Sequence, residues 1–405
     1  MNVKKKIKKE LLSNVLSLGA IDFLGMLIPI ITMPIITRAI GLELYGQYLL
    51  FVTMLTFGHT IIDYGVQYSG VRVAAKNRAN KLALETAYAD YQGLRFVLSG
   101  VFFLFSSLYV VNVFNSIWYL IPLFLYILGY LLTSAWFFQG AALTKYLSIA
   151  SISNKILLLI AIVVFIKSKD DFFLLVLFTT IPIFITSILL LFFLRSRYQI
   201  KLFSLNNIKR TVNDGLSVFI GLLAPNLYNA IPLMLLGNYA DKLEFANFAI
   251  SLKVCGVIFM LQNVVAKSIY PITSRNKNGF KPTLFLNLLI VIPCVLILFF
   301  FGSDLIKVIL GVSLESDIYI KVISTSLIFV AISNSFSVGY FLPNNLDVEY
   351  RNIAIKTSIL SAVIVFFLIY KFSVIGCALG LLTARAILFF NYTLSYKRIY
   401  NEKLS

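Results

Sequence analysis

Twelve apolar segments, each about as long as a bilayer core is thick, constrain the fold of this 405-residue chain more than any other feature. A helix of about 20 apolar residues spans the hydrocarbon core of a membrane, which is roughly 30 Å thick. Only helices and closed barrels satisfy all backbone hydrogen bonds there, and segments of this length indicate helices. They lie at residues 11–36, 46–68, 94–112, 117–139, 146–166, 172–194, 213–236, 246–270, 283–302, 318–341, 352–370 and 374–396. We therefore predict an all-α polytopic membrane protein with about 12 transmembrane helices.

The basic residues alternate in density from one connecting segment to the next. One alternate set of segments, which includes both termini, holds 23 lysines and arginines, and the other set holds 7. Because cytoplasmic loops carry the excess of basic residues, we predict that both termini are cytoplasmic. The net charge of +18 would suggest nucleic acid in a soluble protein. Here it is explained by loops that face anionic membrane lipids, so we expect no nucleic-acid partner.

The connections are too short for a separate soluble domain. The longest predicted outward connection is residues 303–317, whereas a membrane glycosyltransferase or polymerase needs a substantial loop to carry its chemistry. The three cysteines lie in apolar segments without a partner at metal or redox spacing, and His59 is the single histidine. We therefore expect no enzyme activity, no metal and no cofactor. Ion coupling stays open, and the sequence names no ion.

The chain divides near the basic connection at residues 195–210, with six predicted spans on each side. The expected domains are an N-terminal lobe, residues 1–200, and a C-terminal lobe, residues 201–405. With six spans each, the two lobes have the same orientation in the membrane, so any repeat between them is parallel.

Paired prolines support such a repeat. The first span contains Pro29 and Pro34, and the seventh contains Pro225 and Pro232. Breaks at matching positions of two halves point to a substrate path, which would place the first and seventh helices along a cleft. Proline is also tolerated in membrane helices for packing reasons alone, so both interpretations stay open.

Five basic residues lie inside the apolar segments. Arg95 and Lys267 are near predicted inner ends, where a long side chain can snorkel to the headgroups. Lys155, Lys253 and Arg385 are about 10 Å or more from the nearer outer edge. An unshielded cation there costs at least about 2.5–3.5 kcal/mol, so these three should face a wet cavity or a partner.

The acidic candidates inside the spans are Asp22 and Asp63. One interpretation pairs them with basic residues, Asp22 with Lys155 and Asp63 with Arg72. Two anions cannot neutralise three deep cations and Arg72, so we favour a cavity that accepts an anion. Its lining is predicted to be Lys155, Lys253 and Arg385, with Arg38 and Arg72 towards its two mouths, and with Asp22 and Asp63 orienting them or taking part in ion coupling. Aromatic residues along the fourth span, among them Trp136 and Phe137, either stack on sugars or pack.

Three motifs resemble those of the O-antigen flippases, the Wzx-type polysaccharide-unit transporters. They are PIITRAIGLELYGQYLLF at 34–51, IIDYGVQYSGVRVAAKNR at 61–78 and SAWFFQGAALTKY at 134–146. The resemblance extends over roughly residues 14–146. Many members have an acidic residue after the glycine of the third motif, where this chain has Ala141, so no role can be assigned to that acid here.

The resemblance implies membership of the multidrug/oligosaccharidyl-lipid/polysaccharide exporter superfamily. Two six-helix lobes would then surround a central cavity and work by alternating access. The implied substrate is an O-antigen oligosaccharide unit on undecaprenyl pyrophosphate, moved across a bacterial inner membrane during lipopolysaccharide biosynthesis. Implied partners are membrane lipids, a polysaccharide polymerase and a chain-length regulator. The main alternative, an exporter of cationic drugs, predicts a carboxylate-rich cavity.

Overall fold

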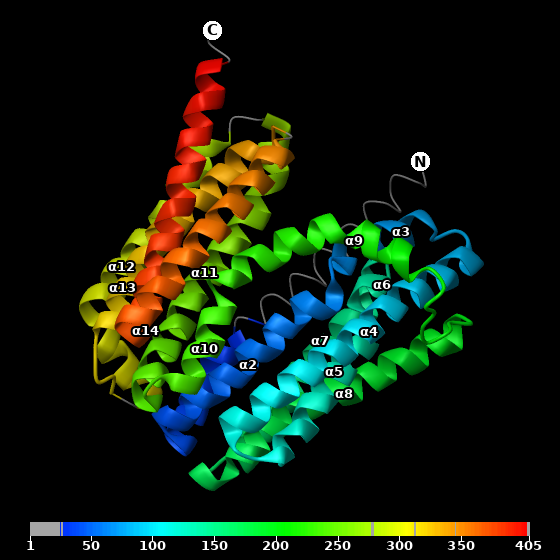
Figure 1. Cartoon of the computed structure of the whole chain (residues 1–405), viewed down its shortest axis with the longest axis horizontal. Coiled ribbons are helices and arrows are strands. Elements are labelled where there is room, and N and C mark those ends of the chain that lie inside the picture. Colours follow the sequence, from blue (N-terminus) through cyan, green and yellow to red (C-terminus); the bar gives the residue numbers. More distant parts are fainter. Residues whose placement is uncertain (1–24, 26, 277–278, 312, 345, 403–405) are drawn as a thin grey trace. The chain divides into compact units, whose positions relative to one another are not determined.

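The computed structural model describes residues 25, 27–276, 279–311, 313–344 and 346–402, and every regular element among them is helical (Figure 1). An apolar helix, Leu27–Ile40, comes first. It is followed by α2 (Leu42–Asp63), α3 (Val66–Lys76), α4 (Lys81–Phe114), α5 (Leu120–Thr133), α6 (Ala135–Gly140), α7 (Thr144–Phe165), α8 (Phe172–Arg197), α9 (Ile208–Leu223), α10 (Ala230–Tyr239), α11 (Lys242–Asn276), α12 (Phe280–Leu310), α13 (Ile318–Phe336) and α14 (Asp347–Glu402).

The lengths of these helices confirm a polytopic membrane fold. Eight are long and apolar enough to cross a membrane, and two bent pairs, α2 with α3 and α9–η3 with α10, raise the number to ten. The long element α14 contains a non-helical residue, Ser373, with φ 52° and ψ −127°, which divides it into two helices. With α14 divided and the shorter apolar helix Leu27–Ile40 added, the described helices agree approximately with the twelve predicted spans.

The contacts of the chain group into two compact units. Unit 1 comprises the residues up to Ile40 and Phe51–Leu223, and unit 2 comprises Gly41–Leu50 and Ala224–Ser405. In unit 1, α5 packs against α4 and α8, and α8 packs against α7. In unit 2, α13 packs against α11, α12 and α14. The expected lobes, residues 1–200 and 201–405, and their internal repeat stay predictions.

Two spans are bent where the backbone leaves the helix. Between α2 and α3 the chain turns by 45°, and Tyr64 and Gly65 there have positive φ angles of 46° and 77°. Between α9 and α10 it turns by 41°, through the short 3₁₀ helix η3 (Ala224–Leu227) that contains Pro225. Pro29 and Pro34, by contrast, lie within continuous helix.

The basic connection between α8 and α9 is fastened to α4 of the same unit. The Gln199 amide donates to Glu85 Oε1 at 2.7 Å, and the Ser204 amide donates to the Ala89 carbonyl at 2.8 Å. The Phe203 ring stacks on Phe96 with 4.4 Å between centroids. These contacts fix where α9 begins on unit 1.

Candidate functional site

A buried ion pair joins two helices of unit 1 at the predicted site residue Asp63. Arg95 Nε on α4 donates to Asp63 Oδ1 on α2 at 3.0 Å, and the two side chains are only 1% and 14% exposed. The prediction that Arg95 snorkels to the headgroups is therefore wrong, and so is the pairing of Asp63 with Arg72. Packing of α4 beside the end of α2 gives Arg95 a carboxylate partner inside the protein, so its charge is paired without reaching the headgroups.

All three guanidinium nitrogens of Arg95 donate hydrogen bonds. Besides Nε, the Nη1 atom donates to Gln92 Oε1 and to the Leu131 carbonyl, each at 2.9 Å, and Nη2 donates to the Tyr130 carbonyl at 3.1 Å. Tyr130 in turn donates its hydroxyl to Asp63 Oδ2 at 2.5 Å. These hydrogen bonds join α2, α4 and α5. Because most of the five N–H donors of the guanidinium already have partners, Arg95 has little capacity left to bind an anionic ligand.

The lone histidine belongs to the same network, a role that the sequence analysis missed. His59 Nε2 and the Tyr126 hydroxyl are 2.7 Å apart, and the His59 ring stacks on Tyr130 with centroids 3.9 Å apart and planes inclined by 9°. His59 and Asp63 are four residues apart on α2, as Tyr126 and Tyr130 are on α5. This matched spacing, which places each pair on one helix face, is the sequence signal from which the contact could have been predicted.

Lys155 lies on α7 and approaches the first apolar helix. A Cβ atom placed on Gly25 would be 3.2 Å from Lys155 Nζ, so the ammonium group lies directly over that glycine. The side chain is half-buried. Its proposed partner Asp22 lies outside the described residues, so the pairing of Asp22 with Lys155 stays a prediction.

Arg385 and Lys253 are the deep cations of unit 2. Arg385, in the second part of α14, donates Nη1 to Ser326 Oγ on α13 at 2.5 Å, and Tyr228 and Cys255 lie close enough to interact with its charge. Lys253, on α11, is half-buried, and no hydrogen bond or ion pair links it to another residue that the structure describes. Neither cation has a carboxylate partner among the described residues.

The two remaining predicted cations are at the surface of unit 1. Arg38 is exposed near the end of the first apolar helix, and Arg72 is exposed on α3. The described members of the predicted set therefore divide between the units. Arg38, Asp63, Arg72 and Lys155 belong to unit 1, and Lys253 and Arg385 belong to unit 2. That all of them line one cavity stays a prediction.

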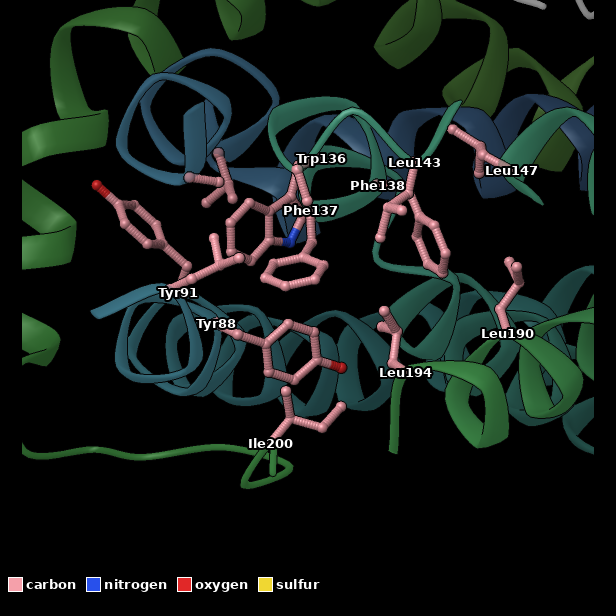
Figure 2. Close-up of a cluster of buried hydrophobic side chains, with 14 residues drawn as sticks. Tyr88, Tyr91, Trp136, Phe137, Phe138, Leu143, Leu147, Leu190, Leu194 and Ile200 are labelled. Carbon is pink, nitrogen blue, oxygen red and sulfur yellow. The ribbon is translucent and has the colours of Figure 1, made fainter. Parts of the chain in front are cut away.

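The aromatic residues of the third motif form the core of unit 1. Trp136, Phe137 and Phe138 are 3%, 0% and 0% exposed, and they pack with Tyr88 and Tyr91 of α4 (Figure 2). Side chains buried to this degree cannot stack on a sugar, so the packing interpretation is the right one for Trp136 and Phe137.

Sequence comparison identifies relatives over most of the chain. The family described as "Polysaccharide biosynthesis protein" matches residues 11–277. A protein of Escherichia coli K12 that is named for O-antigen transport is 24% identical over 397 residues, which cover 94% of this chain and 95% of the relative. A second protein with the same name, from Shigella dysenteriae, is 23% identical over 266 residues, which cover 65% of this chain and 67% of the relative.

Two solved structures show the same fold at low sequence identity. An inward-facing multidrug resistance MATE family transporter of the MOP superfamily matches with a TM-score of 0.71 and 12% identity, covering 94% of this chain and 96% of that structure. The lipid II flippase MurJ in an inward closed conformation matches with a TM-score of 0.68 and 13% identity, covering 95% and 87%.

Proposed function

Since this chain belongs to the polysaccharide biosynthesis protein family, we propose that it is a flippase for oligosaccharide units linked to undecaprenyl pyrophosphate. The units would be those of an O-antigen, moved from the inner to the outer leaflet of a bacterial inner membrane. The names of the two bacterial relatives support transport of O-antigen rather than synthesis or polymerisation of sugars. The name of the MurJ structure supports a lipid-linked substrate.

One observation carries the proposed substrate. Two half-buried cations, Lys253 and Arg385, lie on membrane-spanning helices of unit 2 without a carboxylate partner among the described residues. A cation at this depth is costly unless water or an anion reaches it. Pyrophosphate is a strong, multiply charged anion, and Arg and Lys bind such groups through charge-assisted hydrogen bonds. A cavity for cationic drugs would need the opposite charge, so the drug-exporter alternative is disfavoured.

The remaining candidate residues would have supporting roles. Lys155 would extend the anion path in unit 1, and Arg38 and Arg72, both exposed, would draw the pyrophosphate to the two mouths. Asp63 pairs with Arg95, so Asp63 would position helices or take part in ion coupling. Asp22 would orient Lys155. Translocation would proceed by alternating access, and the product would pass to a polymerase and a chain-length regulator.

Charge-neutral substitutions of the two cations test this function. In a strain that depends on the protein for surface polysaccharide, Lys253→Gln and Arg385→Gln should abolish surface polymer and cause lipid-linked units to accumulate on the inner leaflet. Lys253→Arg should retain more activity than Lys253→Gln. The matched control is Lys321→Gln in the same unit, which removes a lysine whose side chain is 41% exposed and pairs with Asp317. Normal surface polymer in the Lys253→Gln/Arg385→Gln double variant would rule out anion binding by these cations.

A further inference from the structure

A pocket of about 320 Å³ in unit 1 is not used by the function proposed above. It lies between the connection from α3 to α4, the first turns of α4 and the first turn of α9. Its volume is at the small end of the range for small-molecule sites. The polar side chains that line it are those of Asn77, Asn80, Thr86, Asp90, Tyr91, Arg210, Thr211 and Asp214.

The hydrophobic core of unit 1 aims one of these side chains at the pocket. The ring of Tyr91 is 3% exposed and packs 5.5 Å from Trp136, measured between centroids. Its hydroxyl points away from Trp136 (Figure 2) and donates to Asp214 Oδ2 on α9 at 3.3 Å. Trp136 of the third sequence motif therefore packs against Tyr91, whose hydroxyl lies at the wall of the pocket.

The connection before α9 also holds a residue of the pocket in place. Asn207 Nδ2 donates to Asp90 Oδ2 at 2.9 Å, next to the stacked rings of Phe203 and Phe96. Together with the bond between Tyr91 and Asp214, this contact holds α9 against α4. Asp90, Tyr91 and Asp214 are therefore held in place on regular helices before a ligand arrives, which lowers the entropic cost of binding.

Two amides present complementary groups that the protein leaves unused. Asn77 Nδ2 donates a hydrogen bond to the Val73 carbonyl at 3.0 Å, which leaves Oδ1 as an acceptor. Asn80 Oδ1 accepts a hydrogen bond from the Ala83 amide at 3.1 Å, which leaves Nδ2 as a donor. Neither remaining atom has a partner among the described residues. Both residues line the pocket, so each can offer its remaining atom to a hydroxyl group, which both donates and accepts.

The charges of the pocket disfavour an anionic ligand. It contains the two carboxylates of Asp90 and Asp214 and a single cation, Arg210, whose Nε is already 4.0 Å from Asp214 Oδ2. Carboxylates and amides can each engage neighbouring hydroxyls of a polyol, and the apolar side chains of Val73 and Leu82 can cover the C–H face of a sugar ring.

We propose that this pocket binds a neutral sugar of the oligosaccharide unit and so selects the glycan before translocation. The inference rests on the proposed function for the identity of the glycan. The pocket includes Asn77 and Arg210, the chain neighbours of Lys76 and Lys209, and the charge pattern predicts that these two lysines lie on the cytoplasmic side. A site there meets the substrate on the side from which it enters.

A direct binding measurement tests the proposal. The probe is the organism's own oligosaccharide unit, released from its carrier lipid by mild acid and added to the full-length protein in nanodiscs. Saturation-transfer NMR should detect binding to the wild type. Asp90→Asn, Asp214→Asn and Tyr91→Phe should each weaken it about tenfold, because each removes or weakens a hydrogen bond of the polar wall. The controls are Asp304→Asn and Tyr239→Phe, which alter exposed residues of unit 2 and should bind normally.

Transport of lipid-linked units by reconstituted vesicles separates this inference from the function on which it rests. If the wild type transports the units but does not bind the free glycan, or if Asp90→Asn binds it normally, the sugar site is wrong and the flippase stands. If the wild type binds the glycan through these residues but transports nothing, the sugar site stands and the flippase does not. Displacement of the glycan by an equal concentration of phosphatidylglycerol would assign the pocket to a lipid headgroup and overturn the proposal.

Discussion

The backbone of Tyr64, at the break between α2 and α3, rests directly on Gly215 of α9, so that a Cβ atom on Gly215 would lie 2.5 Å from the Tyr64 carbonyl oxygen. The Tyr64 ring also stacks on Phe219 one turn later, with centroids 4.3 Å apart. The bent second span and the first part of the seventh span thus meet backbone to backbone within unit 1.

We therefore expect Gly215→Ala to destabilise unit 1. The added methyl group must push α9 away from a carbonyl that cannot rotate aside, and overpacking of this kind typically costs about 1–3 kcal/mol. The measurement is the thermal unfolding midpoint of the purified protein in detergent. Gly221→Ala on the same helix, where nothing lies within 4 Å, is the control and should be neutral. Equal midpoints for the two variants would contradict the close approach.

The ion pair between Asp63 and Arg95 should be essential for folding. Asp63→Asn or Arg95→Gln leaves one buried charge without its partner, which typically costs about 3–5 kcal/mol. Both variants should show a large fall in unfolding midpoint and in expression. Removal of an exposed pair by Lys321→Gln should change the midpoint little, since Lys321 and Asp317 are 41% and 50% exposed. A stable Arg95→Gln variant would refute the structural role of the pair.

Lys253 should show the reverse behaviour, with stability and activity moving in opposite directions. Lys253→Met removes a half-buried cation that has no described partner, so the desolvation penalty of the charge disappears. We expect an unfolding midpoint at or above that of the wild type, together with loss of surface polysaccharide. A lower midpoint would mean that the lysine contributes to packing or has a partner in the folded protein.

The orientation of the spans is tested with reporter fusions. Fusions after Lys76, Arg210 and Lys281 should report the cytoplasm, and fusions near Gly41, Asp170 and Asp241 should report the periplasm. A swapped signal at one adjacent pair would change the orientation of every later span and so contradict the twelve-span topology.

The spans were predictable because a membrane demands long apolar helices, and the described helices follow the expected segments closely. The bend after Asp63 was not expected, since the residues around Tyr64 and Gly65 read as the end of one apolar segment and give no proline signal. Proline did mark the break at Pro225, although Pro29 and Pro34 lie in helix.

The contacts of the candidate site could not be predicted, because the sequence does not say which helices pack against each other. Depth in the membrane can be counted along a helix, and on that basis Arg95 was placed at a snorkelling position. Which helix faces which depends on lateral packing, and packing puts Arg95 beside Asp63 and His59 beside Tyr130. The sugar pocket depends on the contact between α4 and α9, two segments more than a hundred residues apart in the chain.

The ion pair between Asp63 and Arg95 also sets an order of events during synthesis. Asp63 leaves the ribosome before Arg95 exists, and Tyr130, its second donor, follows later still. Until then α2 carries an unpaired carboxylate at its end, which opposes stable residence in lipid. The second span should therefore stay at the insertion machinery until α4 and α5 arrive, and the three helices should enter the bilayer together.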